Sequence, residues 1–225
     1  MIKVVFTDID DTLLDFTECS RIAVKASCRK YGLSFSSELL DRFMRITSRM
    51  WKDIENGAIT REVLIKTRWN TVFSELGIDF DGELFEKSFR SDFYDTGEKV
   101  EGSDELLGYL SQKYTVCAAS NAPYDQQLHR LKIAGLHGYF DYVFTSEKIG
   151  YTKPDPRFFH ACIDELKNIE PHQIIMIGDS LRADIAGAAA CGITTCYFKR
   201  VNDAEATDVK ADYTVTSLLQ IKDLL

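Results

Sequence analysis

The chain has 225 residues, with 27 basic and 35 acidic side chains and a formal charge of −8 at pH 7. This length allows one large domain, or one domain with a modest insertion. A hydrophobic fraction of 45% with 28% charged residues argues against intrinsic disorder and coiled coil. The acidic balance argues against a nucleic-acid polymer as partner, because binding a phosphate backbone needs a basic stripe.

The N-terminus and the cysteines bear on the compartment. A short apolar run reaches Asp8 without the pattern of a signal peptide, and no apolar run approaches the ~18 residues that span a membrane. We therefore expect a cytoplasmic protein with no membrane partner. The six cysteines form no C-x-x-C pair and have no histidine at zinc spacing, so we expect reduced, structural thiols.

The first predicted strand spans residues 3–7, and a long helical interval follows it. From about residue 16 to residue 97 there is no convincing strand and no proline, and helical patterns cover residues 20–31, 37–54, 60–76 and 82–94. Gly32, Gly57 and Gly77 fall where helix ends are expected. We therefore predict a helical domain over residues 16–97, inserted after the first strand.

Beyond this interval, apolar runs of strand length alternate with helix-period sequence. The predicted strands span residues 114–119, 142–145, 174–177, 194–198 and, more weakly, 213–215. The predicted helices span residues 104–112, 125–134, 157–167 and 183–191. This alternation indicates a parallel sheet covered on both faces. The predicted fold class is α/β, a doubly wound parallel sheet built from residues 1–15 and 98–225 with an inserted α-helical domain.

Candidate catalytic residues lie at the ends of these strands. Asp8 and Asp10 follow the first strand, and because side chains two apart on an extended segment point the same way, both could face one pocket. Ligands of open α/β sheets bind outside the carboxyl ends of the strands. The other candidates are Ser120 and Asn121 at the end of the second strand, Lys153 in a loop ahead of a helix, and Asp179 and Asp184 after the fourth strand.

Each of these residues also has an ordinary structural explanation, since Asp and Ser cap helices and lysines are usually solvated. Together they suit phosphoryl transfer through a covalent aspartyl intermediate. Asp8 would attack phosphorus, because a carboxylate can accept a phosphoryl group. Asp10 would protonate the leaving oxygen and later deprotonate the hydrolytic water.

Two carboxylates cannot approach a phosphate dianion unaided, so this chemistry calls for added positive charge. Mg²⁺ would bridge the carboxylates, with Asp179 as a further ligand and Asp184 holding the ion or its waters. Ser120 would donate to a phosphoryl oxygen, and Lys153 would balance charge in the transition state.

In this order, the motifs resemble the four signatures of the haloacid dehalogenase-like hydrolase superfamily. The matching segments are Asp8-Ile9-Asp10-Asp11-Thr12, Ser120-Asn121, Lys153-Pro154 and Gly178-Asp179-Ser180 with Asp184. They span the Rossmann-like part of the chain, and the helical interval resembles that family's cap in position and length. The resemblance implies Asp8 as nucleophile and Asp10 as general acid and base. It also implies the Asp10 backbone carbonyl as a Mg²⁺ ligand beside Asp8 and Asp179, and Ser120, Asn121 and Lys153 as the phosphate-binding group.

Asp10 separates branches of the superfamily. The true dehalogenases lack an aspartate two residues after the nucleophile, so its presence favours phosphate-ester cleavage. A finer resemblance, to pyrimidine nucleotide 5′-phosphatases, lies in the segment from Asp10 to Phe16 and in cap residues that include Trp51, Gly57, Thr60-Arg61 and Thr67-Arg68. It implies a small nucleoside monophosphate as the phosphorylated metabolite that this protein binds.

Substrate choice would then fall to the cap. Trp51, Trp69, Arg61 and Arg68 could stack on a base or pair with phosphate. The competing explanation is structural, because aromatic residues at helical spacing usually pack in a core and surface arginines are usually solvated.

Other functions share parts of this pattern. A receiver-like phospho-acceptor signalling module also combines acidic residues, a hydroxyl and a lysine, but it is roughly half this length and has no helical insertion. Within the same superfamily, a sugar-phosphate phosphatase or a phosphomutase remains an alternative, and a phosphate-release assay separates the mutase from a hydrolase.

Overall fold

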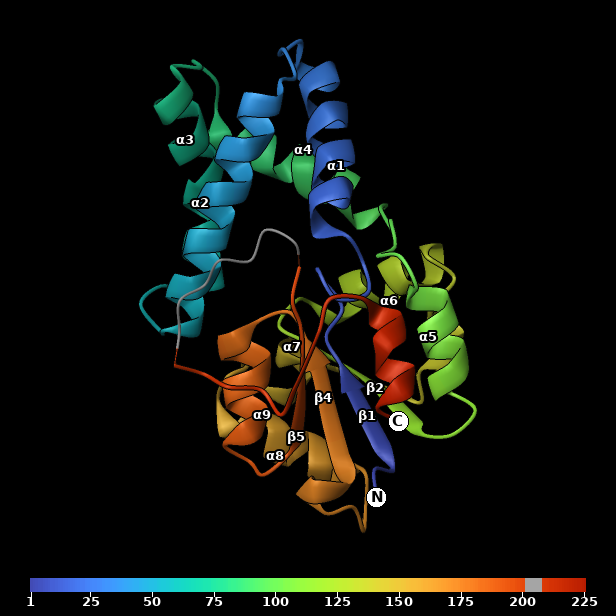
Figure 1. The fold of residues 1–225 in the computed structure, drawn as a ribbon. Helices are drawn as coiled ribbons and strands as arrows, with labels where there is room; N and C mark the ends of the chain where they lie inside the picture. The colour runs from blue at the N-terminus through green and yellow to red at the C-terminus, as the bar shows by residue number, and fades with distance from the viewer. Residues whose placement is uncertain (201–207) are drawn as a thin grey trace. The chain divides into compact units, whose positions relative to one another are not determined.

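The computed structural model describes residues 1–200 and 208–225, which form two compact units. Unit 1 contains Met1–Asp15 and Gly97–Leu225, and unit 2 contains Phe16–Thr96. Figure 1 shows a sheet flanked by helices for the first unit and a group of helices for the second. In the part of the chain that the structure describes, no helix is long and apolar enough to cross a membrane.

Unit 1 is built on a six-stranded parallel sheet, which confirms the predicted fold class. Its strands, in the order β3-β2-β1-β4-β5-β6, are β1 (Val4–Thr7), β2 (Thr115–Ser120), β3 (Tyr142–Thr145), β4 (Ile174–Gly178), β5 (Thr194–Phe198) and β6 (Tyr213–Val215). In register, Thr7 at the end of β1 lies opposite Ala118 and Ile177. The carboxyl ends of β1, β2 and β4 therefore meet at one edge of the sheet.

Helices cover both faces of this sheet because successive strand residues point to opposite sides. Val5 belongs to a core with leucines of α5 (Ser103–Leu110) and α6 (Tyr124–Ile133), whereas Val4 and Phe6 belong to a second core. That second core includes Phe158, Phe159 and Cys162 of α8 (Pro156–Glu165), the helix predicted over residues 157–167.

The segment after β4 departs from the predicted helix 183–191. A wide π-helical turn, η3 (Leu181–Ala186), comes first and a short helix, α9 (Gly187–Ala189), follows it. The backbone N–H groups of Asp184 and Ile185 both donate to the carbonyl of Ser180, which widens the turn. Such turns occur often at functional sites. The remaining elements are α7 (Ser146–Ile149) and the short turns η1 (His137–Tyr139), η2 (Pro171–Gln173) and η4 (Leu218–Asp223).

Unit 2 is entirely helical in the structure. Its helices are α1 (Phe16–Tyr31), α2 (Ser37–Glu55), α3 (Arg61–Leu76) and α4 (Gly82–Tyr94). Ser36, Thr60 and Asp81 cap the last three, each accepting a backbone N–H with its side chain. Helix α1 begins four residues before the predicted start at residue 20, because Phe16 packs on Phe93, with ring centroids 5.4 Å apart, and extends the buried face.

All six cysteines are buried and free, as predicted. Burial raises the pKa of the Cys28 thiol to about 11, so this thiol stays protonated and packs as a small apolar side chain.

Candidate active site

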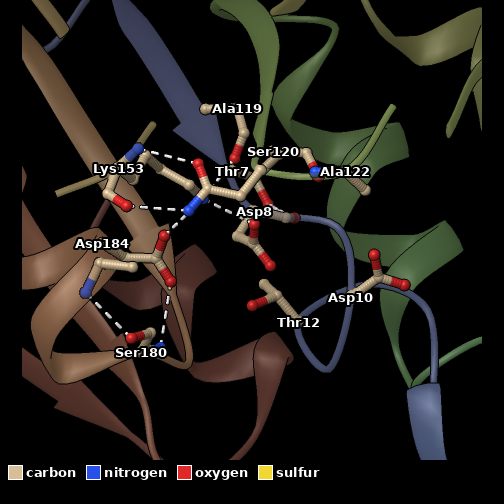
Figure 2. Close-up of polar contacts among 12 residues, drawn as sticks. Thr7, Asp8, Asp10, Thr12, Ala119, Ser120, Ala122, Lys153, Ser180 and Asp184 are labelled. Carbon is tan, nitrogen blue, oxygen red and sulfur yellow. Dashed lines mark hydrogen bonds and ion pairs between the residues drawn. The ribbon is translucent and has the colours of Figure 1, made fainter. Parts of the chain in front are cut away.

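The side chain of Lys153 occupies the centre of the edge where β1, β2 and β4 end. Only 2% of the residue is exposed, and its Nζ donates to Asp8 Oδ1 at 2.7 Å and to Asp184 Oδ1 at 2.6 Å. It also donates to the Ala119 carbonyl at 2.5 Å. Figure 2 shows this ammonium between Asp8 and Asp184. One cation thus joins the ends of two strands to the turn that follows β4.

Asn121 holds the loop that carries Lys153. Its Oδ1 accepts the Lys153 backbone N–H at 2.8 Å, and its Nδ2 donates to the Lys153 carbonyl at 2.9 Å. Both ends of the Asn121 amide thus bond to the backbone of Lys153, and the assignment of Asn121 to the phosphate-binding group stays a prediction. Its role in this structure is to place Lys153.

Three carboxylates converge beside the ammonium, as the strand pattern predicted. One oxygen each from Asp8, Asp179 and Asp184 lies within 4.8 Å of the others. Thr12, fully buried, donates its hydroxyl to Asp179 Oδ1 at 3.2 Å. Gly178 lets Asp184 approach the strand, because a Cβ at that position would lie 2.2 Å from Asp184 Oδ2.

Burial and mutual repulsion disfavour charge on these carboxylates. Burial is the main cause that raises the pKa of Asp8 to about 8, with Lys153 opposing it and Asp184 and Asp10 adding to it. Burial and the neighbouring Asp8 likewise raise the pKa of Asp179 well above its ordinary range. For Lys153, burial alone would lower the pKa, but Asp184 and Asp8 outweigh burial and raise it.

This donor set fits a hard divalent cation. The cluster offers only carboxylate oxygens, which Mg²⁺ and Ca²⁺ prefer, and three carboxylates exceed the charge of one ammonium. A cation among them would offset the mutual repulsion, which adds to burial in raising the pKa of Asp8 and Asp179.

Asp10 lies apart from this cluster, on the other side of Asp8 from Lys153 in Figure 2. Its Oδ1 accepts from Arg130 Nη1 at 2.5 Å, and its Oδ2 accepts from Gln127 Nε2 at 2.7 Å. The same Gln127 Nε2 donates to Ser120 Oγ at 2.9 Å, and the Ala122 N–H donates to that hydroxyl at 3.1 Å. With both Ser120 lone pairs accepting, its O–H is the group left to donate to a ligand.

Three residues of this site were not predicted as such: Thr12, Gln127 and Arg130. Thr12 lies inside the first motif, and its position in that motif is the feature of the sequence that could have identified it as a site residue. Gln127 and Arg130 are three residues apart in α6 and so share one face, but their spacing alone does not distinguish a buried polar face from a solvated one.

Residues 2–192 match the family described as haloacid dehalogenase-like hydrolase. The chain belongs to that family. Pyrimidine 5′-nucleotidase PynA of Streptococcus pneumoniae is 30% identical to this member over 99% of the chain and 94% of PynA. Pyrimidine 5′-nucleotidase YjjG of Escherichia coli is 27% identical over 98% of the chain and 96% of YjjG.

The crystal structure of magnesium-bound HAD-hydrolase YfnB from Bacillus subtilis superposes with a TM-score of 0.94 at 25% identity. It covers 100% of this haloacid dehalogenase-like chain and 98% of YfnB. By family and by relatives, the protein is an enzyme of the phosphoric monoester hydrolase class, a phosphatase.

The structure corrects two substrate-contact predictions for the helical unit of this hydrolase. Trp69 is 1% exposed and stacks on Phe43, with ring centroids 4.6 Å apart. Arg68 is buried and makes a two-pronged ion pair with Glu86, both N···O distances being 2.8 Å. Both side chains belong to the interior of unit 2. Aromatic rings pack around Trp69, although its buried Nε1–H has no acceptor among the described residues, and Glu86 pairs with Arg68. Trp51 and Arg61 are partly exposed and stay predicted contacts.

Proposed function

We propose that this phosphatase is a Mg²⁺-dependent 5′-nucleotidase that acts on small nucleoside monophosphates through an aspartyl-phosphate intermediate. The observation that carries the proposal is the convergence of Asp8, Asp179 and Asp184 around Lys153, with Asp10 on the other side of Asp8. The similarity to PynA over almost the whole chain supports a nucleotide as the substrate.

In the first step, an Asp8 oxygen attacks phosphorus and the bond from phosphorus to the ester oxygen breaks. Asp10 gives its proton to that oxygen, so the nucleoside leaves as a neutral alcohol and Asp10 becomes a carboxylate. Lys153 donates to Asp8 and neutralises part of the charge that the phosphate brings. Ser120 donates its hydroxyl to a phosphoryl oxygen, since its lone pairs already accept from Gln127 and Ala122.

In the second step, Asp10 takes a proton from water, the water oxygen attacks phosphorus, and the bond from phosphorus to Asp8 breaks. Inorganic phosphate leaves, and Asp8 and Asp10 return to their starting states. The same residue serves as acid and then as base because its carboxyl group stays beside the reacting phosphorus throughout.

Asp8, Asp179 and Asp184 would hold Mg²⁺, with the backbone carbonyl of Asp10 as a further ligand. When bound, the ion supplies positive charge that offsets these carboxylates and the phosphoryl oxygens. Asp184 also accepts from Lys153 and from the Ser180 N–H, so its carboxylate is already oriented toward the cluster.

A substrate panel tests the proposal. Purified protein with Mg²⁺ should release inorganic phosphate from nucleoside monophosphates, pyrimidine ones above all, faster than from sugar phosphates. EDTA should stop the reaction and added Mg²⁺ should restore it. Clear preference for sugar phosphates would leave a phosphatase but exclude the nucleotidase.

Asp8→Asn tests the nucleophile in the same assay. Turnover should fall by at least about 10³-fold, because an amide cannot form the phosphoenzyme. Asp164→Asn is the matched control, since Asp164 is exposed on α8, and it should keep native turnover. An Asp8→Asn variant that keeps most of its activity would exclude the proposed intermediate.

A further inference from the structure

Helix α6 presents two buried polar side chains to Asp10. Gln127 and Arg130 are both 0% exposed, one turn apart on the same face of the helix. Arg130 Nη1 donates to Asp10 Oδ1 at 2.5 Å and to Gln127 Oε1 at 3.2 Å. Gln127 Nε2 donates one hydrogen to Asp10 Oδ2 and the other to Ser120 Oγ.

These contacts hold the Asp10 carboxyl group at both oxygens. A donor on each oxygen restricts rotation of the group about its Cβ–Cγ bond, while each oxygen keeps a second lone pair for a proton. The bond from Arg130 to Gln127 Oε1 in turn orients the amide that reaches Asp10. The Asp10 side chain is 26% exposed, so the edge of the carboxyl group away from α6 remains accessible.

Burying a guanidinium is costly unless an anion and further acceptors accompany it. A leucine or methionine would fill the same volume in this core without that cost. The chain instead places Arg130 against Asp10, and places Gln127 against both Asp10 and the Ser120 hydroxyl. A contact that served packing alone would not need to reach both Asp10 and Ser120.

We propose that Arg130 and Gln127 are positioning residues that hold Asp10 in the orientation needed to protonate the leaving group. The inference rests on the proposed phosphatase mechanism and adds two residues to it. Neither residue touches substrate in this proposal. Each acts through Asp10, and Gln127 also ties the position of Asp10 to that of Ser120.

Substrates with different leaving groups distinguish the positioning role of Arg130 and Gln127 from a purely structural role. An alkyl phosphate expels an alkoxide, which needs a proton as the bond to phosphorus breaks, whereas p-nitrophenyl phosphate expels a phenolate that is stable without one. The constant kcat/KM includes only the steps up to the first irreversible one, which is loss of the leaving group. It therefore reports this protonation and not the later hydrolysis of the phosphoenzyme. Misplacing Asp10 should therefore penalise the alkyl ester more than the aryl ester.

The experiment measures kcat/KM for a nucleoside monophosphate and for p-nitrophenyl phosphate with native enzyme, Arg130→Met, Arg130→Lys and Gln127→Met. The ratio of the two constants is independent of the fraction of folded protein, so a partly unfolded variant still gives a valid result. Lys132→Met is the matched control, because it removes an exposed positive charge from the same helix.

We expect the ratio of alkyl to aryl kcat/KM to fall about 10–100-fold in Arg130→Met, since general acid catalysis contributes about 10²–10⁴-fold. Gln127→Met should show a smaller fall, and Arg130→Lys should recover part of the loss because it keeps the charge without the planar fork. Lys132→Met should keep the native ratio. A pre-steady-state burst of p-nitrophenolate should also appear in Arg130→Met. Asp10 is then poorly placed as a base as well, so hydrolysis of the phosphoenzyme becomes slower than its formation.

An unchanged ratio in Arg130→Met and Gln127→Met would overturn the inference, even if both variants lose overall activity. An increased ratio would also overturn it, because Arg130 would then restrain Asp10 in an inactive position. If native enzyme hydrolyses neither ester, the proposed function itself fails, and that outcome is distinct from a failure of the positioning role.

Discussion

Both units of the molecule bury charged side chains, but they balance the charges differently. In unit 2, Arg68 faces Glu86 through two bonds of 2.8 Å, and the guanidinium also lies against the rings of Phe43 and Phe89. In unit 1, Lys153 faces two carboxylates at once, and a third, Asp179, lies beside them.

The difference teaches how a structural ion pair and a functional cluster can be distinguished. The pair in unit 2 matches one guanidinium to one carboxylate in the planar geometry that suits both groups. The cluster in unit 1 sets three carboxyl groups against one ammonium, so full ionisation of the three would leave negative charge unbalanced, and a bound cation would offset that charge. A buried charge cluster that its own residues leave unbalanced is a candidate for ligand binding.

The largest effect on stability should come from breaking the balanced pair. Arg68→Met leaves the buried Glu86 carboxylate without its partner, and we expect a loss of about 3–5 kcal/mol in the free energy of unfolding at neutral pH. Urea unfolding curves measure it. Arg45→Met is the control, because Arg45 pairs with Glu75 at the surface, and it should change stability by less than about 0.5 kcal/mol.

The pH dependence of this loss has a definite sign. Burial raises the pKa of Glu86 in the native protein, with Arg68 opposing it, so removing Arg68 raises that pKa further. A folded pKa above the unfolded value gives stability that is present at low pH and lost as pH rises through the folded pKa. The deficit of Arg68→Met should therefore shrink as pH falls toward the unfolded pKa of Glu86. If the stability loss of Arg68→Met does not change with pH, lost packing and not the unpaired charge of Glu86 explains that loss.

An intermediate effect should come from moving one carboxylate of the unbalanced cluster. In Gly178→Ala, the new Cβ would lie 2.2 Å from Asp184 Oδ2, so the Asp184 carboxylate, which accepts from Lys153, must shift. We expect kcat/KM to fall about 10–100-fold, the scale associated with a displacement of about 1 Å. Gly138→Ala is the control, because no atom lies within 4 Å of its added Cβ. Equal activity in the two variants would mean that Asp184 need not be held against the strand.

The smallest expected effect is a gain in the free energy of unfolding, opposite in sign to the loss expected for Arg68→Met. In EDTA at neutral pH, Asp179→Asn removes a carboxyl group whose pKa is raised in the folded protein by burial and by Asp8. Folding then no longer has to suppress that charge, and we expect a gain of about 1 kcal/mol in the free energy of unfolding. For a chain of this size, that gain raises the midpoint of thermal unfolding by about 2–4 °C. Asp164→Asn, an exposed carboxylate, should not raise it. A decrease for Asp179→Asn would show that the cluster stabilises the fold without a cation.

Mg²⁺ provides the complementary measurement on the same two proteins. A ligand that binds the native state raises the unfolding midpoint by mass action. Added Mg²⁺ should therefore raise the midpoint of native enzyme more than that of Asp179→Asn, because the variant lacks one anionic ligand.

Much of the fold could be predicted because local patterns are strong in both units. Apolar runs placed all six strands of unit 1, and the four helices of unit 2 follow from their periodicity and from capping residues such as Thr60 and Asp81. The helix expected at residues 183–191 was wrong in its first turn, because the hydrogen bonds of Asp184 and Ile185 to one carbonyl oppose the regular pattern. The spacing of apolar residues does not reveal such a choice.

The amino-acid sequence by itself determined the fold class, the identity of the acidic residues and Lys153, and their order along the strand ends. The register of β1, β2 and β4 then decided which of them meet, because parallel pairing aligns residues far apart in the chain. Burial decided the rest: it placed Arg68 and Trp69 in the interior of unit 2, turned the Asn121 amide onto the backbone of Lys153, and brought Gln127 and Arg130 to Asp10. These outcomes depend on which polar groups lose water together, and that property belongs to the packed structure.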